Sequence, residues 1–111
     1  MLKCIYACTY LYEVMPTYVL LVNLTEKGKR NFKQEFTATR DQFKKAVEQA
    51  GGKLTGYVTA GSYDVVEILD VPNDDAALAM LLGTLSIDAV KITSLRAFPE
   101  DQVKQTLKKT P

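Results

Sequence analysis

The stretch that decides the fold is Gly61-Ser62-Tyr63-Asp64, followed at once by Val65-Val66-Glu67-Ile68-Leu69-Asp70-Val71. Gly61 allows a positive φ where the chain reverses, and Asp64 can accept hydrogen bonds from turn amides. The run behind them is rich in β-branched residues, which fit a pleated and largely buried strand. The stretch therefore predicts a hairpin that leads into a buried strand.

The segments on both sides of this hairpin complete a βαββαβ order. Residues 17–22 form a continuous apolar run typical of a strand with both faces covered. Residues 54–59 and 63–71 predict the two strands of the hairpin, and 89–98 predict a fourth strand. This order is that of the ferredoxin-like split βαβ fold, an α+β architecture with an antiparallel sheet and helices on one face.

The first helix is expected in two parts. Thr25 can cap a short helical turn that runs through Arg30 and Phe32. Thr39-Arg40-Asp41-Gln42 then has the spacing of a capping box, so a longer helix is expected to begin there. Behind it apolar residues recur at helical intervals as far as Gly51-Gly52, a natural C-terminal stop. They are Phe43, Ala46, Val47 and Ala50.

Two more helices are expected, one between the third and fourth strands and one at the end of the chain. Asn73 is a good N-cap for the first of them, because acidic residues follow it at the positive end of the helix dipole. Its buried face is expected to consist of Ala77, Leu78, Leu81, Leu82 and Leu85. Pro99 suits the first turn of the terminal helix, which has acidic residues near its start and lysines near its end.

The sheet face away from the helices is expected to carry apolar surface. The third strand offers Val65, Glu67 and Leu69 on one side and Val66 and Ile68 on the other. Whichever side meets the helices, apolar residues remain on the opposite side, and pairing with a second copy is a common way to cover them. The expected partner is therefore the chain itself, in a homodimer or a higher homo-oligomer.

The composition argues against several classes of function. The 111 residues suffice for one domain, and a net charge of +1 gives little reason to expect nucleic-acid binding. Histidine, the commonest metal ligand and general base, is absent. Cys4 and Cys8 alone cannot complete a tetrahedral metal site and do not make a disulfide framework. We therefore expect no metal, no cofactor and a cytoplasmic location.

The first fourteen residues differ from the rest of the chain. They are apolar and rich in tyrosine, but Lys3, Glu13 and Pro16 interrupt the segment, and a membrane span needs about 20 uninterrupted apolar residues. No smooth apolar region with a cleavage site marks a signal peptide. We expect no membrane partner. Two interpretations of 1–14 stay open: an extra strand or arm, or a leader that does not belong to the native chain, in which case the domain is 15–111.

Several blocks of the sequence resemble the GYD domain family. They are 15–25, 51–53, 61–66 and 95–98, and together they span the chain from Met15 to about Glu100. The resemblance implies a dimeric α/β barrel, a chain start at Met15 and no established activity; Glu67 departs from the apolar residue typical of the family. The hairpin is also similar to the ligand-sensing domains of leucine-responsive transcription regulators, which implies a sensor or assembly module by analogy of fold alone.

Polar residues near the strand ends are the candidates for a ligand site: Asn23, Tyr57, Tyr63, Asp64, Glu67 and Arg96. Tyr63 and Asp64 can orient a small ligand, or Asp64 can cap the hairpin while Tyr63 packs at an interface. Glu67 is unusual because a carboxylate without a partner is costly to bury. It is expected to pair with Arg96, with Lys91 or with a second subunit, as an interface ion pair or as a ligand group.

Three functions remain open at this point. The leading hypothesis is a homo-oligomeric module that binds or senses a small molecule. The second is a cofactor-free enzyme of the isomerase or monooxygenase type, as other dimeric α/β barrels can be. Without histidine it would transfer protons through Tyr63, Asp64 or Glu67. The third is a structural interaction protein.

Overall fold

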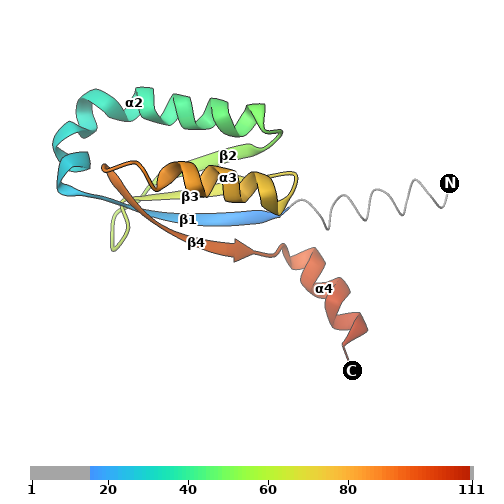
Figure 1. The fold of residues 1–111 in the computed structure, drawn as a ribbon. Coiled ribbons are helices and arrows are strands. Elements are labelled where there is room, and N and C mark those ends of the chain that lie inside the picture. Colours follow the sequence, from blue (N-terminus) through green and yellow to red (C-terminus); the bar gives the residue numbers. More distant parts are fainter. Residues whose placement is uncertain (1–15, 111) are drawn as a thin grey trace.

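Residues 16–110 are described by the computed structural model, and their elements follow the order βαββαβ with a further helix at the end (Figure 1). The strands are β1 (Thr17–Leu24), β2 (Lys53–Val58), β3 (Val65–Asp70) and β4 (Val90–Ala97). The helices are α2 (Glu26–Gln49), α3 (Asp74–Thr84) and α4 (Glu100–Lys109). The ferredoxin-like α+β prediction is confirmed. The segment 1–14 lies outside the described residues, so both interpretations of it stay open.

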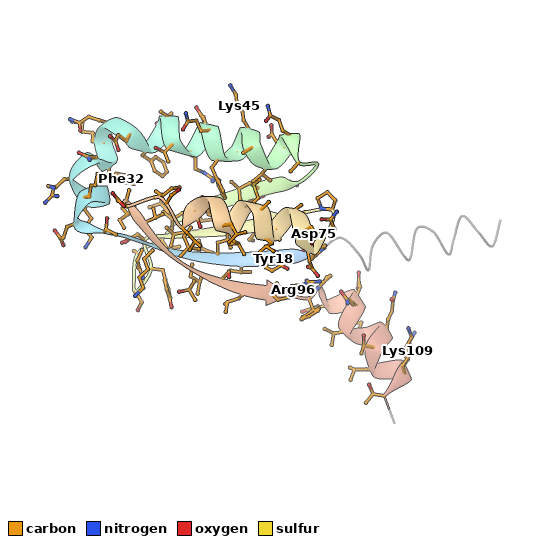
Figure 2. The ribbon with its side chains drawn as sticks, viewed as in Figure 1. Tyr18, Phe32, Lys45, Asp75, Arg96 and Lys109 are labelled. Atoms are coloured by element: carbon orange, nitrogen blue, oxygen red, sulfur yellow. The ribbon has the colours of Figure 1, made fainter. Side chains whose placement is uncertain are left out.

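The four strands form one antiparallel sheet in the order β2-β3-β1-β4. α2 and α3 lie across the same face of this sheet, which we call the covered face, whereas α4 leads away from the end of β4 (Figure 1). No helix among residues 16–110 lies across the opposite, uncovered face. Figure 2 shows Phe32 near one end of the sheet and Tyr18 with Arg96 near the other.

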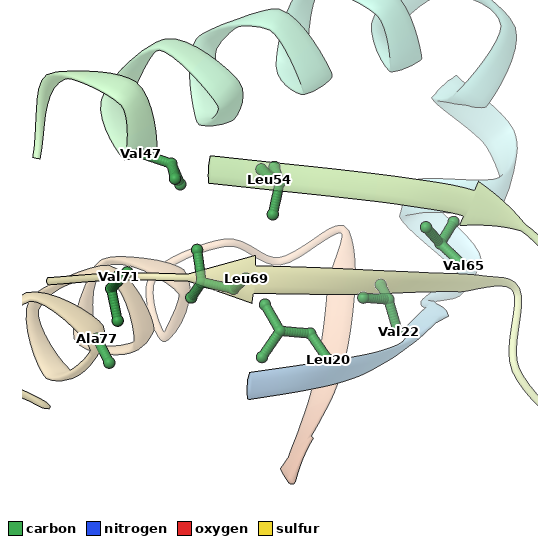
Figure 3. Packing of buried hydrophobic residues seen from close by; sticks show 8 residues of the cluster. All are labelled: Leu20, Val22, Val47, Leu54, Val65, Leu69, Val71 and Ala77. Atoms are coloured by element: carbon green, nitrogen blue, oxygen red, sulfur yellow. The ribbon is translucent and has the colours of Figure 1, made fainter. Parts of the chain in front are cut away.

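The strand register decides which side chains reach the covered face. Leu20 of β1 lies opposite Glu67 of β3 and is completely buried. Because side chains alternate along a strand, Val65, Glu67 and Leu69 all point to the covered face. Figure 3 shows how these strands and the two helices meet in a common core. Its buried residues are Leu20, Val22, Val47, Leu54, Val65, Leu69, Val71 and Ala77.

The expected break in the first helix is wrong. α2 is a single helix from Glu26 to Gln49, and Thr39 lies inside it. Thr25 is confirmed as its N-cap, because its hydroxyl accepts a hydrogen bond from the Gly28 amide at 3.2 Å. Residues 33–38 contain neither glycine nor proline, so nothing interrupts the backbone hydrogen bonds between the two expected parts. The capping signal at Thr39 was local, and helix continuity overrode it.

The expected buried face of α3 is wrong in part. Asn73 caps this helix as predicted, and Ala77 is 1% exposed. However, Leu78, Leu82 and Leu85 are 54%, 55% and 79% exposed. The side that packs on the core consists of Ala76, Ala77, Met80 and Leu81. The helix is apolar on every side, so its apolar periodicity could not identify the side that meets the sheet.

The hairpin between β2 and β3 forms as predicted, although β2 begins and ends one residue earlier than expected and β3 is shorter at both ends. Gly61 has a φ of 152°, a conformation that favours glycine. The Thr59 amide donates to the carbonyl oxygen of Asp64 at 2.9 Å and closes the turn. β3 begins at Val65, after Tyr63 and Asp64, which therefore belong to the connection.

The terminal helix α4 is confirmed, with Pro99 directly before its first residue and lysines in its last turn. Val103 and Leu107 on it are 45% and 63% exposed. Across residues 16–110 we find no helix with the length and apolar character needed to cross a bilayer.

Candidate functional site

A cavity of about 320 Å³ lies between α2, the covered face of the sheet and the connection from α3 to β4. Its walls are mainly apolar and combine aromatic rings from α2 with aliphatic side chains from the strands. The principal apolar residues are Val22, Leu24, Phe32, Phe36, Phe43 and Ile92. A pocket of this size and lining is at the small end of the range for small-molecule sites.

The aromatic wall depends on α2 being one continuous helix. Phe32 and Phe36 are one turn apart, and their ring centroids are 4.6 Å from each other. Arg40 follows one further turn along, so it projects from the same side of the helix as the two rings. The helix thus places two aromatic rings and one cation along a single wall of the cavity.

The start of α2 is held tightly against the beginning of β4. A Cβ atom on Gly28 would lie 2.1 Å from the carbonyl oxygen of Ala89, so only glycine permits this approach. The Thr25 amide donates to that same oxygen at 3.0 Å, and the Thr25 hydroxyl donates to the Asp88 carbonyl oxygen at 2.7 Å. These contacts close one end of the cavity and position Phe32 within its wall.

Glu67 is paired with Arg40 across the cavity wall. Arg40 Nη1 donates to Glu67 Oε1, and the two side chains are 21% and 9% exposed. The expected pairing of Glu67 with Arg96 or Lys91 is therefore wrong. Glu67 points to the covered face, where Arg40 of α2 reaches it. The sequence interpretation divided α2 into two parts at Thr39, so it did not consider Arg40 as a partner.

Gly56 makes room for the arginine. It lies directly opposite Glu67 in the ladder between β2 and β3. A Cβ atom at Gly56 would lie 2.4 Å from Arg40 Nη2. The guanidinium therefore occupies the space that a side chain on β2 would otherwise fill, and it reaches the carboxylate on the neighbouring strand from there.

Burial raises the pKa of the Glu67 carboxyl above its ordinary value. The charge and the hydrogen bond of Arg40 act in the opposite direction, because both favour the carboxylate, but the effect of burial is larger. Glu67 consequently keeps its proton to a higher pH than an exposed glutamate does. A carboxyl group of this kind can exchange a proton or a hydrogen bond with a molecule in the cavity.

Asp64 and Tyr63 have structural contacts outside the cavity. The Asp64 carboxylate accepts a hydrogen bond from the Leu24 amide at 2.8 Å, and its own amide donates to the Val22 carbonyl oxygen at 2.9 Å. Asp64 therefore ties the hairpin to the end of β1 rather than capping its own turn. The Tyr63 carbonyl oxygen accepts from the Thr59 hydroxyl at 2.6 Å.

Asn23 and Tyr57 lie on the uncovered face of the sheet. Each is the strand neighbour of a residue on the covered face, Val22 and Gly56 respectively, so its side chain points the other way. Tyr57 is 58% exposed. The sheet therefore separates both residues from Glu67.

Arg96 belongs to a cluster at the far end of the sheet. Its guanidinium lies 5.5 Å from the ring centroid of Tyr18 and 4.7 Å from that of Phe98. The Tyr18 hydroxyl donates to Asp74 at 2.7 Å, and this hydrogen bond is the main cause that raises the pKa of Tyr18. Among the predicted site residues only Glu67 lines the cavity, so the structure does not bring them together.

The sequence interpretation missed Arg40, Phe32 and Phe36 as cavity residues. A signal for them was present, because positions 32, 36, 40 and 43 recur at the spacing of one helical side. The expected break before Thr39 divided this series into two parts and hid it.

Comparison with known protein families identifies the family of this chain. The family model for the GYD domain matches residues 18–107 of this chain. The chain belongs to the GYD domain family. The match begins at the second residue of β1 and includes the other three strands of this GYD domain, and it contains both Arg40 and Glu67.

One curated relative is the NDP-glycosyltransferase YjiC of Bacillus subtilis (strain 168). It is 38% identical over 76 residues, which make up 68% of the present chain. The GYD protein covers only 18% of the length of that enzyme. The similarity thus concerns a small part of the transferase.

Proposed function

We propose that this GYD domain protein is a small-molecule binding or sensing module that works as a homo-oligomer, with the cavity under α2 as its binding site. The observation that carries the proposal is the cavity of about 320 Å³ with apolar walls and a charge pair on one side. Apolar pockets with a few convergent polar groups are the usual form of small-molecule sites.

Two features distinguish this cavity from a packing defect. A packing defect is a small enclosed void, whereas this space opens to solvent and its volume falls within the range of small-molecule pockets. It also adjoins a carboxyl group with a raised pKa and a guanidinium that Gly56 accommodates. Titratable groups that face a pocket and have a perturbed pKa are typical of functional sites.

The uncovered face of the sheet supports assembly with a second copy. Its inner strands carry Val19, Leu21, Val66 and Ile68, which are only half-buried in one chain. A continuous apolar area of this kind is rare on a monomer. The partner that the resemblance to dimeric α/β barrels favours is a second sheet of the same protein.

A cofactor-free enzyme is a second candidate, and Glu67 is the observation that favours it. Burial raises the pKa of its carboxyl above the ordinary value, as is typical of carboxyl groups that take or give a proton in catalysis. Tyr63 and Asp64 do not line the cavity, so proton transfer there would depend on Glu67. Turnover that Glu67→Gln abolishes without loss of binding would favour this candidate over simple binding.

The binding proposal can be tested with N-phenyl-1-naphthylamine, an uncharged fluorescent probe. Leu24 lines the cavity at the end of β1, so Leu24→Trp should fill part of the space. Leu78→Trp adds the same ring at an exposed position of α3 and serves as the control. We expect micromolar binding to the wild type, at least about tenfold weaker binding to Leu24→Trp and unchanged binding to Leu78→Trp.

The result that contradicts the proposal is equally direct. A wild-type protein that binds no probe, or a Leu24→Trp variant that binds it as well as the wild type, would show that the cavity is not a binding site. Because the chain has no tryptophan, the fluorescence of the introduced indole can follow urea unfolding of each variant and so shows whether the variant is folded.

A further inference from the structure

The charge pair in the cavity has unused hydrogen-bonding capacity on both partners. Among residues 16–110, the Arg40 side chain donates one hydrogen bond, to Glu67 Oε1, although a guanidinium carries five donors. Glu67 Oε2 accepts none from this part of the chain. Among the described residues, every side-chain nitrogen or oxygen that is fully buried has a hydrogen-bond partner. The free donors and the free oxygen are therefore accessible, and both side chains line the cavity.

The balance of charge limits what can bind to these groups. The pair is neutral as a unit, and each charge offsets the other at low exposure. An anion on Arg40 would lie beside the carboxylate of Glu67, and a cation on Glu67 would lie beside the guanidinium. Like charges that close together repel each other between walls that are mainly apolar. Glu35, an exposed residue at the cavity, adds a further negative charge against anions.

Gly56 fixes where the free donors lie. The Cβ position of Gly56 is 2.4 Å from Arg40 Nη2, 2.8 Å from its Cζ and 3.3 Å from its Nε. The guanidinium is thus seated against the backbone of β2, next to Glu67. Donor and acceptor are therefore held side by side, next to the apolar rings of α2.

We infer that the cavity selects an uncharged ring compound that presents a hydrogen-bond acceptor to Arg40 and a donor to Glu67 from one planar group, such as a primary carboxamide. The inference rests on the proposed function of the cavity as a binding site. A cavity of about 320 Å³ accommodates one or two rings. Gly56 acts as a positioning residue, because it sets the place of the guanidinium without contacting the ligand itself.

The test uses three compounds that share one ring system and differ in charge. They are naphthalene-2-carboxamide, 2-naphthoate and 2-naphthamidine, titrated at pH 7 and followed by their own fluorescence. In the wild type the carboxamide should bind at least about tenfold more tightly than either ion, or roughly 1.4 kcal/mol. Equal affinities for all three compounds would overturn the inference.

Removing one charge at a time should change the preference in a defined direction. Glu67→Gln leaves the cation of Arg40 unopposed, so 2-naphthoate should become the tightest ligand. Arg40→Gln leaves the carboxylate unopposed, so 2-naphthamidine should gain instead. If both variants ranked the three compounds in the same order as the wild type, the pair would not be what selects the uncharged ligand.

Gly56→Ala tests the geometry with every charge retained. The added methyl group meets the flexible end of Arg40, so the fold can adjust while the guanidinium is displaced. Carboxamide affinity should fall at least about fivefold, whereas N-phenyl-1-naphthylamine should bind as before. Gly83→Ala is the matched control, because its methyl group would meet nothing within 4 Å. Unchanged carboxamide binding in Gly56→Ala overturns the inference even if the charge variants fail to fold.

The outcomes also separate this inference from the proposed function. Binding of N-phenyl-1-naphthylamine that depends on Leu24, together with no discrimination among the three naphthalene compounds, removes the ligand class and keeps the binding site. No binding of the probe or of any of the three compounds to the wild type removes both.

Discussion

The covered face of the sheet buries Leu20 and Leu69 completely, whereas the uncovered face leaves Tyr57 and Leu95 58% and 48% exposed. Both faces are made by the same four strands, and both carry apolar side chains. Among residues 16–110 the only buried charged residue is Glu67, and it lies on the covered face. The usual arrangement of polar residues outside and apolar residues inside is thus locally reversed.

This reversal indicates that the two faces of the sheet have different functions. A buried carboxyl is costly to keep, and Arg40 and the cavity account for its presence on the covered face. Exposed apolar side chains on a sheet are an aggregation risk unless something covers them. The covered face is therefore the place to expect ligand chemistry, and the uncovered face is the place to expect assembly.

The largest expected effect concerns the core under the helices. Leu69→Ala removes a completely buried side chain and should lower the free energy of unfolding by about 2 to 5 kcal/mol. Ile68→Ala changes the next residue, on the uncovered face, and is the matched comparison. Urea unfolding at two protein concentrations checks both variants. The loss for Leu69→Ala should not depend on concentration, whereas any loss for Ile68→Ala should shrink on dilution, because the proposed dimer dissociates and no longer stabilises the wild type.

A loss below about 1 kcal/mol for Leu69→Ala would show that the covered face is not the main core. A loss for Ile68→Ala that matches it at every concentration would remove the distinction between the faces.

A smaller effect is expected when a charge is placed on the uncovered face. Ile68→Lys should weaken dimerisation at least about tenfold, or roughly 1.4 kcal/mol, because a lysine would be buried between two sheets. Leu78→Lys, at a 54% exposed position of α3, is the control and should leave assembly unchanged. Light scattering across a dilution series measures both. Ile68→Lys that assembles like the wild type, or a wild type that is a stable monomer at micromolar concentration, would contradict the proposed assembly.

The smallest expected effect is the pH dependence that Glu67 contributes. Its pKa is raised in the fold, so the folded state binds the proton more tightly than the unfolded state does. This contribution to stability is fully present below the unfolded pKa of about 4.3 and is lost as the pH rises through the folded pKa. Glu67→Gln lacks it, so the variant should gain stability relative to the wild type as the pH rises across this window.

Urea unfolding from pH 4 to pH 8 checks this prediction, with Glu48→Gln at an exposed position of α2 as the control. The prediction is contradicted if the difference in unfolding free energy between wild type and Glu67→Gln stays constant with pH or changes in the opposite direction. Burial would then not raise the pKa of the carboxyl group.

Features that depend on neighbouring residues were readable from the sequence. Gly61 adopts the positive φ that its turn requires. Thr25 and Asn73 each accept the amide hydrogen bond expected of an N-cap. The strand positions followed from β-branched runs and the turns between them. In each case the physical cause acts within a few residues, so no knowledge of the rest of the molecule was needed.

The predictions failed where two local signals competed or where all sides of an element looked alike. Thr39 has the spacing of a cap, but helix formers on both sides kept α2 continuous and so brought Phe36 and Arg40 into the cavity. α3 is apolar all round, so its sequence could not show that Leu85 stays 79% exposed while Ala77 is buried. Only packing against the sheet distinguishes these sides.

By itself, then, the sequence determined the order of elements, their caps and the presence of a carboxylate in a buried strand. Tertiary structure alone decided which face Glu67 takes, that Arg40 is its partner and that Gly56 leaves room for the guanidinium. Helix caps and turns are set by backbone groups a few residues apart. The charge pair joins residues 27 positions apart, and its geometry exists only once strand register and helix packing bring α2 over β2 and β3.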